Sequence, residues 1–143
     1  MPLILLIHCL ATLSMLAVIW FVQIVHYPLM LHAGTERFTA YMEQHRRRIS
    51  YIVVPLMVIE LGTGGWLVAG DVDYIRPFTA WLGLALLLAI WLTTFTIQVP
   101  LHRRLALGYD RAVLERLIST NWVRTILWSC RGVMLVVVML DNG

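Results

Sequence analysis

The chain has 143 residues, of which 60% are hydrophobic, and its mean hydropathy is +0.80. Soluble domains average about 45–50% apolar residues, so a soluble fold of this size would leave too much apolar surface uncovered. The composition therefore predicts a single domain, spanning 1–143, that is embedded in a membrane. The formal net charge is +3, and all 11 basic residues are arginine. Because no stripe of base-stacking aromatic residues accompanies them, they indicate membrane topology and argue against a nucleic-acid partner.

Four apolar segments are each long enough to cross a bilayer as a helix. We expect these helices at about residues 2–27, 36–69, 77–101 and 121–140. A short interfacial helix is also expected over Asp110–Ser119, with Asp110 as its cap and an apolar side facing the lipid. The predicted fold class is therefore an all-α membrane protein, an antiparallel four-helix transmembrane bundle with one short interfacial helix.

Arginine residues predict how this bundle is oriented. Only Arg76 lies in the connection between the second and third segments. The positive-inside rule then places both termini on the non-cytoplasmic side of a multi-pass protein, with bacterial inner membrane as the expected location. The two connections that would face the cytoplasm carry the remaining loop arginines, Arg37, Arg46, Arg47, Arg48, Arg103, Arg104, Arg111 and Arg116.

The fourth segment carries a polar stripe that the other helices have to accommodate. At about 100° per residue, one face of this helix collects five residues, namely Asn121, Arg124, Thr125, Trp128 and Arg131. Arg131 would lie near the middle of the membrane, where a cation costs several kcal/mol unless it is paired. Glu60 lies at a similar depth in the second segment, so we predict a buried Glu60–Arg131 pair. It would serve either as a catalytic proton relay or as a structural anchor.

A second polar group is expected at the cytoplasmic end, where all four helices contribute. Its members are His26, His45, Gln98, His102, Asn121 and Arg124. We interpret the three histidines as metal ligands or proton carriers, since histidine changes its charge near neutral pH. Gln98, Asn121 and Arg124, with Trp128, would bind a cofactor or ligand. The spacing is not a recognised metal motif, so bis-histidine haem ligation and an ordinary interfacial role both stay open.

Two sets of motifs resemble known membrane proteins. The first comprises Trp20-Phe21, Pro28, Phe38, Met42-Glu43, Pro55 and Gly64-Gly65-Trp66-Leu67. It resembles small four-helix bacterial oxidoreductases of the HemJ-type protoporphyrinogen oxidase family, which implies haem-associated, porphyrinogen-oxidising chemistry. The second comprises Gln98-Val99-Pro100-Leu101-His102, Gly108-Tyr109-Asp110 and 120–125. It resembles a widespread group of uncharacterised bacterial integral membrane proteins. Neither resemblance supplies a catalytic residue for this chain.

The first function hypothesis is a membrane-embedded redox protein. It would bind a haem, a transition metal or a quinone- or porphyrin-like ligand in a polar pocket between the helices. One alternative is a non-enzymatic accessory or scaffold subunit of a membrane complex. Another is a small proton or weak-acid transporter with a wet path joining His8, Glu60 and His26. Membrane lipids are expected partners in each case, together with a homo-oligomer or a larger complex.

Overall fold

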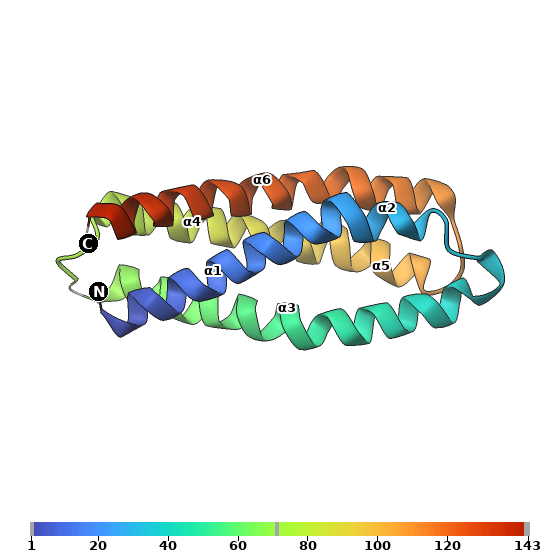
Figure 1. Cartoon of the computed structure of the whole chain (residues 1–143), viewed down its shortest axis with the longest axis horizontal. Helices are drawn as coiled ribbons and strands as arrows, with labels where there is room; N and C mark the ends of the chain where they lie inside the picture. The colour runs from blue at the N-terminus through green and yellow to red at the C-terminus, as the bar shows by residue number, and fades with distance from the viewer. Residues whose placement is uncertain (1, 71, 142–143) are drawn as a thin grey trace.

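The computed structural model describes residues 2–70 and 72–141. Within these residues the secondary structure consists of helices joined by short turns, with no strand. Four rods run side by side and alternate in direction, so the first turns of α1 and the last turns of α6 lie at the same end (Figure 1). Each rod is long and apolar enough to cross a membrane. The expectation of an all-helical fold with four candidate spans is therefore confirmed.

The rods differ in how they are built. The second joins a short 3₁₀ helix, η2 (Thr35–Arg37), to the long helix α3 (Phe38–Ala69), and the fourth is the single helix α6 (Arg111–Asp141). The first and third rods share one plan, in which an α-helix, one π-helical segment and a short α-helix follow each other. They consist of α1 (Leu3–Phe21), η1 (Val22–His26) and α2 (Tyr27–Met30), and of α4 (Pro77–Thr93), η3 (Thr94–Gln98) and α5 (Val99–Leu105).

The two π segments have the same local cause. Pro28 and Pro100 each follow the last residue of a π segment by two positions. Proline has no backbone N–H, and its ring crowds the carbonyl group four residues earlier, which here belongs to η1 or η3. A π turn widens the helix at that point, and such turns are frequent at functional sites. The consequence is that His26 and Gln98, which end the two π segments, are reoriented relative to a regular helix.

The prediction of a separate interfacial helix over Asp110–Ser119 is wrong. α6 continues from Arg111 to Asp141 without interruption, because neither glycine nor proline separates the first turns from the apolar segment. Leu114 and Leu117 are fully buried, in an apolar cluster with Phe38 and Met42, and so do not face the headgroups. The first turns of α6 therefore belong to the core.

Asp110 caps α6 as expected, since its Oδ1 accepts a hydrogen bond from the backbone N–H of Val113 at 3.1 Å. We expect Asp110→Ala to lower the free energy of unfolding by about 0.5–2 kcal/mol, because a helix-terminal N–H loses its acceptor. Thermal denaturation in detergent measures this as a lower Tm. Asp110→Asn keeps an acceptor and should stay close to wild type; equal Tm values for the wild type and the alanine variant would contradict the cap.

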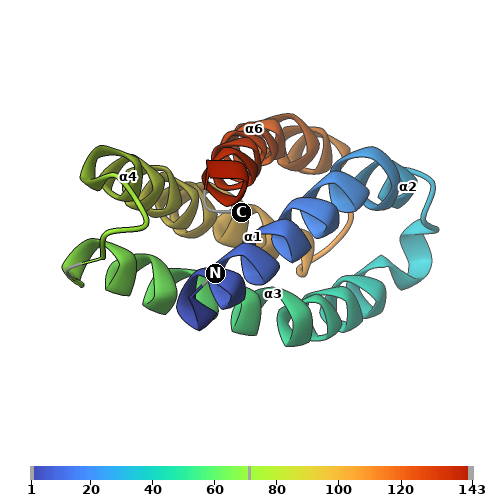
Figure 2. The same ribbon diagram turned by 60° about the vertical axis from the view of Figure 1, so that its left-hand side comes forward.

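The helices enclose alternating apolar and polar levels. α1 lies between α3 and α6, and α4 lies beside α6 (Figure 2). One apolar cluster, with Phe38 and Leu114, fills the end that carries most arginines; a second, with Met15 and Trp128, fills the middle. Between and beside them lie buried polar side chains. Outside, large apolar side chains such as Leu92, Trp66 and Ile126 are exposed, as a lipid-facing surface requires.

Candidate functional site

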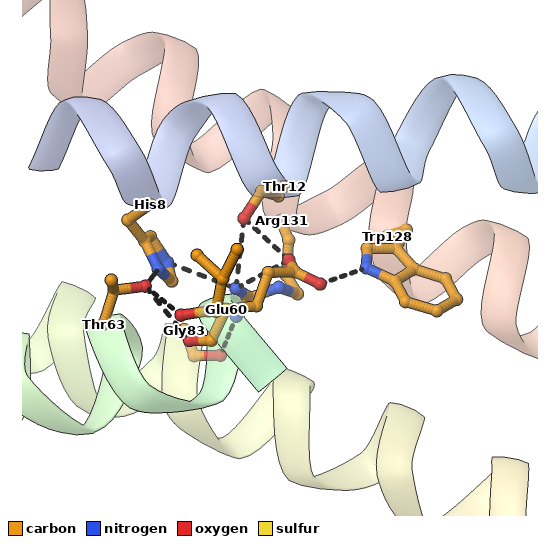
Figure 3. Close-up of polar contacts among 8 residues, drawn as sticks. His8, Thr12, Glu60, Thr63, Gly83, Trp128 and Arg131 are labelled. Carbon is orange, nitrogen blue, oxygen red and sulfur yellow. Dashed lines mark hydrogen bonds and ion pairs between the residues drawn. The ribbon is translucent and has the colours of Figure 1, made fainter. Parts of the chain in front are cut away.

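The deep polar layer is centred on the predicted ion pair, and the pairing itself is confirmed. Arg131 Nη2 lies 3.3 Å from Glu60 Oε1, and both side chains are almost completely buried. The Thr12 hydroxyl donates to Glu60 Oε1 at 2.7 Å. The Trp128 indole N–H donates to Oε2 at 3.1 Å (Figure 3). Both carboxylate oxygens are therefore satisfied.

His8, which the sequence analysis considered only as part of a proton path with Glu60 and His26, joins this layer directly. Arg131 Nη2 approaches His8 Nε2 at 3.2 Å, and a guanidinium has only donors, so Nε2 must accept. The proton of the neutral ring is then on Nδ1, which donates to Thr63 Oγ1 at 2.6 Å. The Thr63 hydroxyl donates in turn to the Ile59 carbonyl group at 2.6 Å. The sequence did contain one sign of this position: Thr12 lies one turn after His8, so the two polar side chains share a face of the first helix.

The layer links all four rods and leaves little free space. Arg131 also donates to the backbone carbonyl of Gly83 in α4, so α1, α3, α4 and α6 all contribute. The cavity beside Arg131 has a volume of only about 20 Å³, enough for one water molecule but not for a ligand. This geometry favours the anchoring role for Glu60 and Arg131 over the catalytic one.

The three predicted histidines do come together at the arginine-rich end. His26 Nε2 and His45 Nδ1 share a hydrogen bond of 2.8 Å, and their rings stack with centroids 4.6 Å apart. The His45 and His102 rings stack at 5.5 Å. Tyr27, which the sequence analysis did not select, shares a 2.9 Å hydrogen bond between its hydroxyl and His102 Nε2. The three imidazoles and one phenol therefore form a compact cluster.

This packing gives no support to the predicted metal centre. Among residues 2–70 and 72–141, no three His, Cys, Asp or Glu side chains are arranged to hold a metal ion. The Nε2 atoms of His26 and His102 are both engaged in hydrogen bonds. The stacked rings of His26 and His45 also leave no room for a porphyrin between them. A proton-carrying role suits the observed contacts better than ligation.

A cavity of about 270 Å³ lies beside this cluster, between α3 and the third rod. Its walls are mostly apolar, with Met15, Ile19 and Met57 among them. Val54 and Phe95 also line it and are more than half exposed, so the cavity reaches the lipid-facing surface. At its polar end lie Tyr27, His45, Gln98, His102 and Arg124.

Four buried polar atoms that belong to residues lining this cavity lack a hydrogen-bond partner within the described chain. Buried polar groups are almost always paired, and each unpaired one costs about 1–3 kcal/mol. In the described residues a fifth such atom, Arg131 Nε, belongs to the deep layer. The four atoms on cavity-lining residues are Trp91 Nε1, Gln98 Oε1, His102 Nδ1 and Arg124 Nε. Their concentration around one cavity marks it as the strongest candidate for a ligand site.

The hydrogen-bonding character of these atoms follows from their neighbours. The Thr120 hydroxyl donates to the Arg116 carbonyl group at 2.7 Å, so towards Gln98 it must accept. The Gln98 amide nitrogen donates to it at 3.0 Å, which leaves Oε1 as a free acceptor. The indole N–H of Trp91 and the Nε–H of Arg124 are donors. The residues that line the cavity thus carry at least two donors and one acceptor that no protein group satisfies.

Asn121 and Trp128, predicted as ligand groups, instead hold Arg124 in place. Arg124 Nη1 donates to Asn121 Oδ1 at 3.2 Å, and the guanidinium carbon lies 5.2 Å from the centroid of the Trp128 ring. Asn121 is itself fixed by a 2.8 Å hydrogen bond to Gln23 Oε1. Neither Asn121 nor Trp128 lines the cavity. Of the predicted ligand-binding residues, Gln98 and Arg124 do.

Comparison of the chain with models of known protein families, with curated proteins and with solved structures finds no match.

Proposed function

We propose that this chain is a multi-pass membrane protein that binds a flat, lipid-soluble ligand of the quinone class in the cavity between α3 and the third rod. The arginine-rich end would face the cytoplasm, with both termini on the other side. The observation that carries the proposal is the set of four unpartnered polar atoms around one apolar cavity.

A quinone matches this cavity in shape and in hydrogen bonding. Its ring is flat and apolar, as the mainly aliphatic and aromatic walls require. Its carbonyl oxygens would accept from Trp91 and Arg124, and the hydroxyl group of the reduced form would donate to Gln98. The exposure of Val54 and Phe95 supports entry from the lipid phase. A porphyrin is the other ligand class that a flat apolar site admits, and extraction of bound ligand distinguishes the two.

The histidine cluster would serve proton exchange with the bound ligand. His102 and His45 line the cavity, and His102 is hydrogen-bonded to Tyr27. Reduction of a quinone to a quinol takes up two protons together with two electrons. The electrons would come from a separate reduced partner protein, and the protons would pass through titratable groups beside the ring. This arrangement supports the redox hypothesis, while Glu60 and Arg131 anchor the bundle below the site.

Binding of a short-chain benzoquinone analogue to purified protein in mild detergent tests the proposal, with calorimetry as the readout. Trp91→Phe keeps an aromatic ring and removes the N–H, so the affinity should fall by about 2- to 10-fold. Arg124→Gln should weaken binding by about 10-fold or more, because a charged donor is lost. The matched control is Trp81→Phe, an exposed residue of the same helix, which should leave the affinity unchanged.

Mass spectrometry of small molecules extracted from the wild-type protein completes the test. Stoichiometric quinone is the expected result, and a porphyrin would reassign the ligand class. If folded wild-type protein contains neither and does not bind the analogue, the proposal is overturned and the accessory-subunit hypothesis takes its place.

A further inference from the structure

A second cavity, of about 590 Å³, lies between the first rod and α3 at the arginine-rich end. His45, Val18 and Ile49 line both this cavity and the candidate ligand cavity, so only a thin wall separates the two. The deeper part of the second cavity is apolar, with Ala17, Val18, Phe21, Val22 and Ile52. Phe21 and Ile52 are at least half exposed, so this part faces the lipid.

Along the α3 wall of this cavity the side chains change from polar at the arginine-rich end to apolar further into the membrane. Tyr41, Gln44 and Arg48 follow one another at helical spacing of three and four residues, and therefore lie on one face. Ile52, one turn further into the membrane, continues the same face as an apolar side chain. A groove with polar groups at the membrane edge and apolar walls below has the same gradient as a phospholipid.

The polar residues at the arginine-rich end of the groove carry donors for an anion. No Asp or Glu lines the cavity in the described residues, and Arg48 supplies a guanidinium. Gln44 Oε1 accepts from Arg47 Nη2 at 3.2 Å, which leaves the Gln44 amide N–H groups for another acceptor. The Tyr41 hydroxyl adds a further donor. Guanidinium and amide donors at a membrane edge are the groups that hold lipid phosphates.

We propose that this groove binds one anionic phospholipid of the leaflet at the arginine-rich end. Its phosphate would lie at Tyr41, Gln44 and Arg48, and an acyl chain would lie along Phe21 and Ile52. Charge complementarity selects an anionic lipid over a zwitterionic one, because no carboxylate in the lining of the groove would attract a choline group. The site is separate from the quinone cavity, and the inference does not depend on the proposed function.

Native mass spectrometry after exchange into micelles with equal amounts of phosphatidylglycerol and phosphatidylcholine tests this. The wild type should retain one phosphatidylglycerol in preference to phosphatidylcholine by about 10-fold or more. Arg48→Gln should abolish the preference. Arg103→Gln removes an exposed arginine from α5 outside the groove and should leave it unchanged.

Ala17→Phe keeps the charge and fills the apolar end of the groove, at a position that is exposed and therefore tolerant of a larger side chain. It should release the retained lipid. Equal retention of the two lipids by the wild type overturns the proposal. So does an equal loss of preference in Arg48→Gln and Arg103→Gln, which would indicate general surface attraction.

Discussion

Glu60→Gln should destabilise the folded bundle by about 3–5 kcal/mol, the range seen when one partner of a buried ion pair is removed. The substitution is nearly isosteric, so packing is preserved. It leaves Arg131 without a counter-ion at a position where only 1% of its side chain is exposed. The other hydrogen-bond partners of Arg131, namely the Gly83 carbonyl group, the Thr12 hydroxyl and His8, are neutral acceptors and cannot replace the carboxylate. Reversible unfolding in mixed detergent micelles measures the change.

Two further variants identify the cause of the loss. In Glu60→Gln combined with Arg131→Met no unpaired charge remains, so the double variant should be more stable than Glu60→Gln alone. Glu43→Gln changes an exposed carboxylate of the same helix and should have little effect. If the double variant is no more stable than Glu60→Gln alone, the pair does not act as one unit and the anchoring role is refuted.

The ion pair could be predicted from the sequence because residue spacing determines both the depth of a side chain in the membrane and the face of the helix on which it lies. Segment lengths place Glu60 and Arg131 at a common level, and an unpaired charge at that level is too costly to leave exposed to lipid. The same reasoning located the four spans. It also placed the three histidines at one end of the bundle, since each lies in the part of its rod that is nearest the arginine-rich connections.

The side-chain contacts around the ligand cavity and the histidine cluster could not be predicted from residue spacing. A regular period of 3.6 residues does not anticipate the π segments before Pro28 and Pro100, which change the rotation of everything that follows. Whether Asn121 faces a ligand or Arg124 depends on this rotation and on Gln23, which lies in a π segment. The polar atoms without a hydrogen-bond partner could not be predicted either, because they are identified only once the packing of all four rods is known.

Trp128 connects the two polar levels, and its removal is expected to have the second large effect. The side chain is fully buried; its N–H donates to Glu60 and its ring lies under the Arg124 guanidinium. Trp128→Ala should lower the free energy of unfolding by about 3–5 kcal/mol, because a large cavity opens in the middle of the bundle. Loss of the hydrogen bond to a carboxylate and of the cation–π contact adds to the effect. Unfolding in mixed micelles again provides the measurement.

Trp128→Phe separates packing from polar contacts. It keeps most of the ring volume and removes the N–H, so we expect a loss of about 1.5–3 kcal/mol, the range for a hydrogen bond to a charged group. Trp122→Phe, a partly exposed position on the same helix, should cost less than about 1 kcal/mol. Because Arg124 lines the ligand cavity, Trp128→Ala should also weaken quinone binding although Trp128 itself does not line it. Unchanged affinity in folded Trp128→Ala protein would show that Trp128 does not position Arg124, and that the two polar levels are independent.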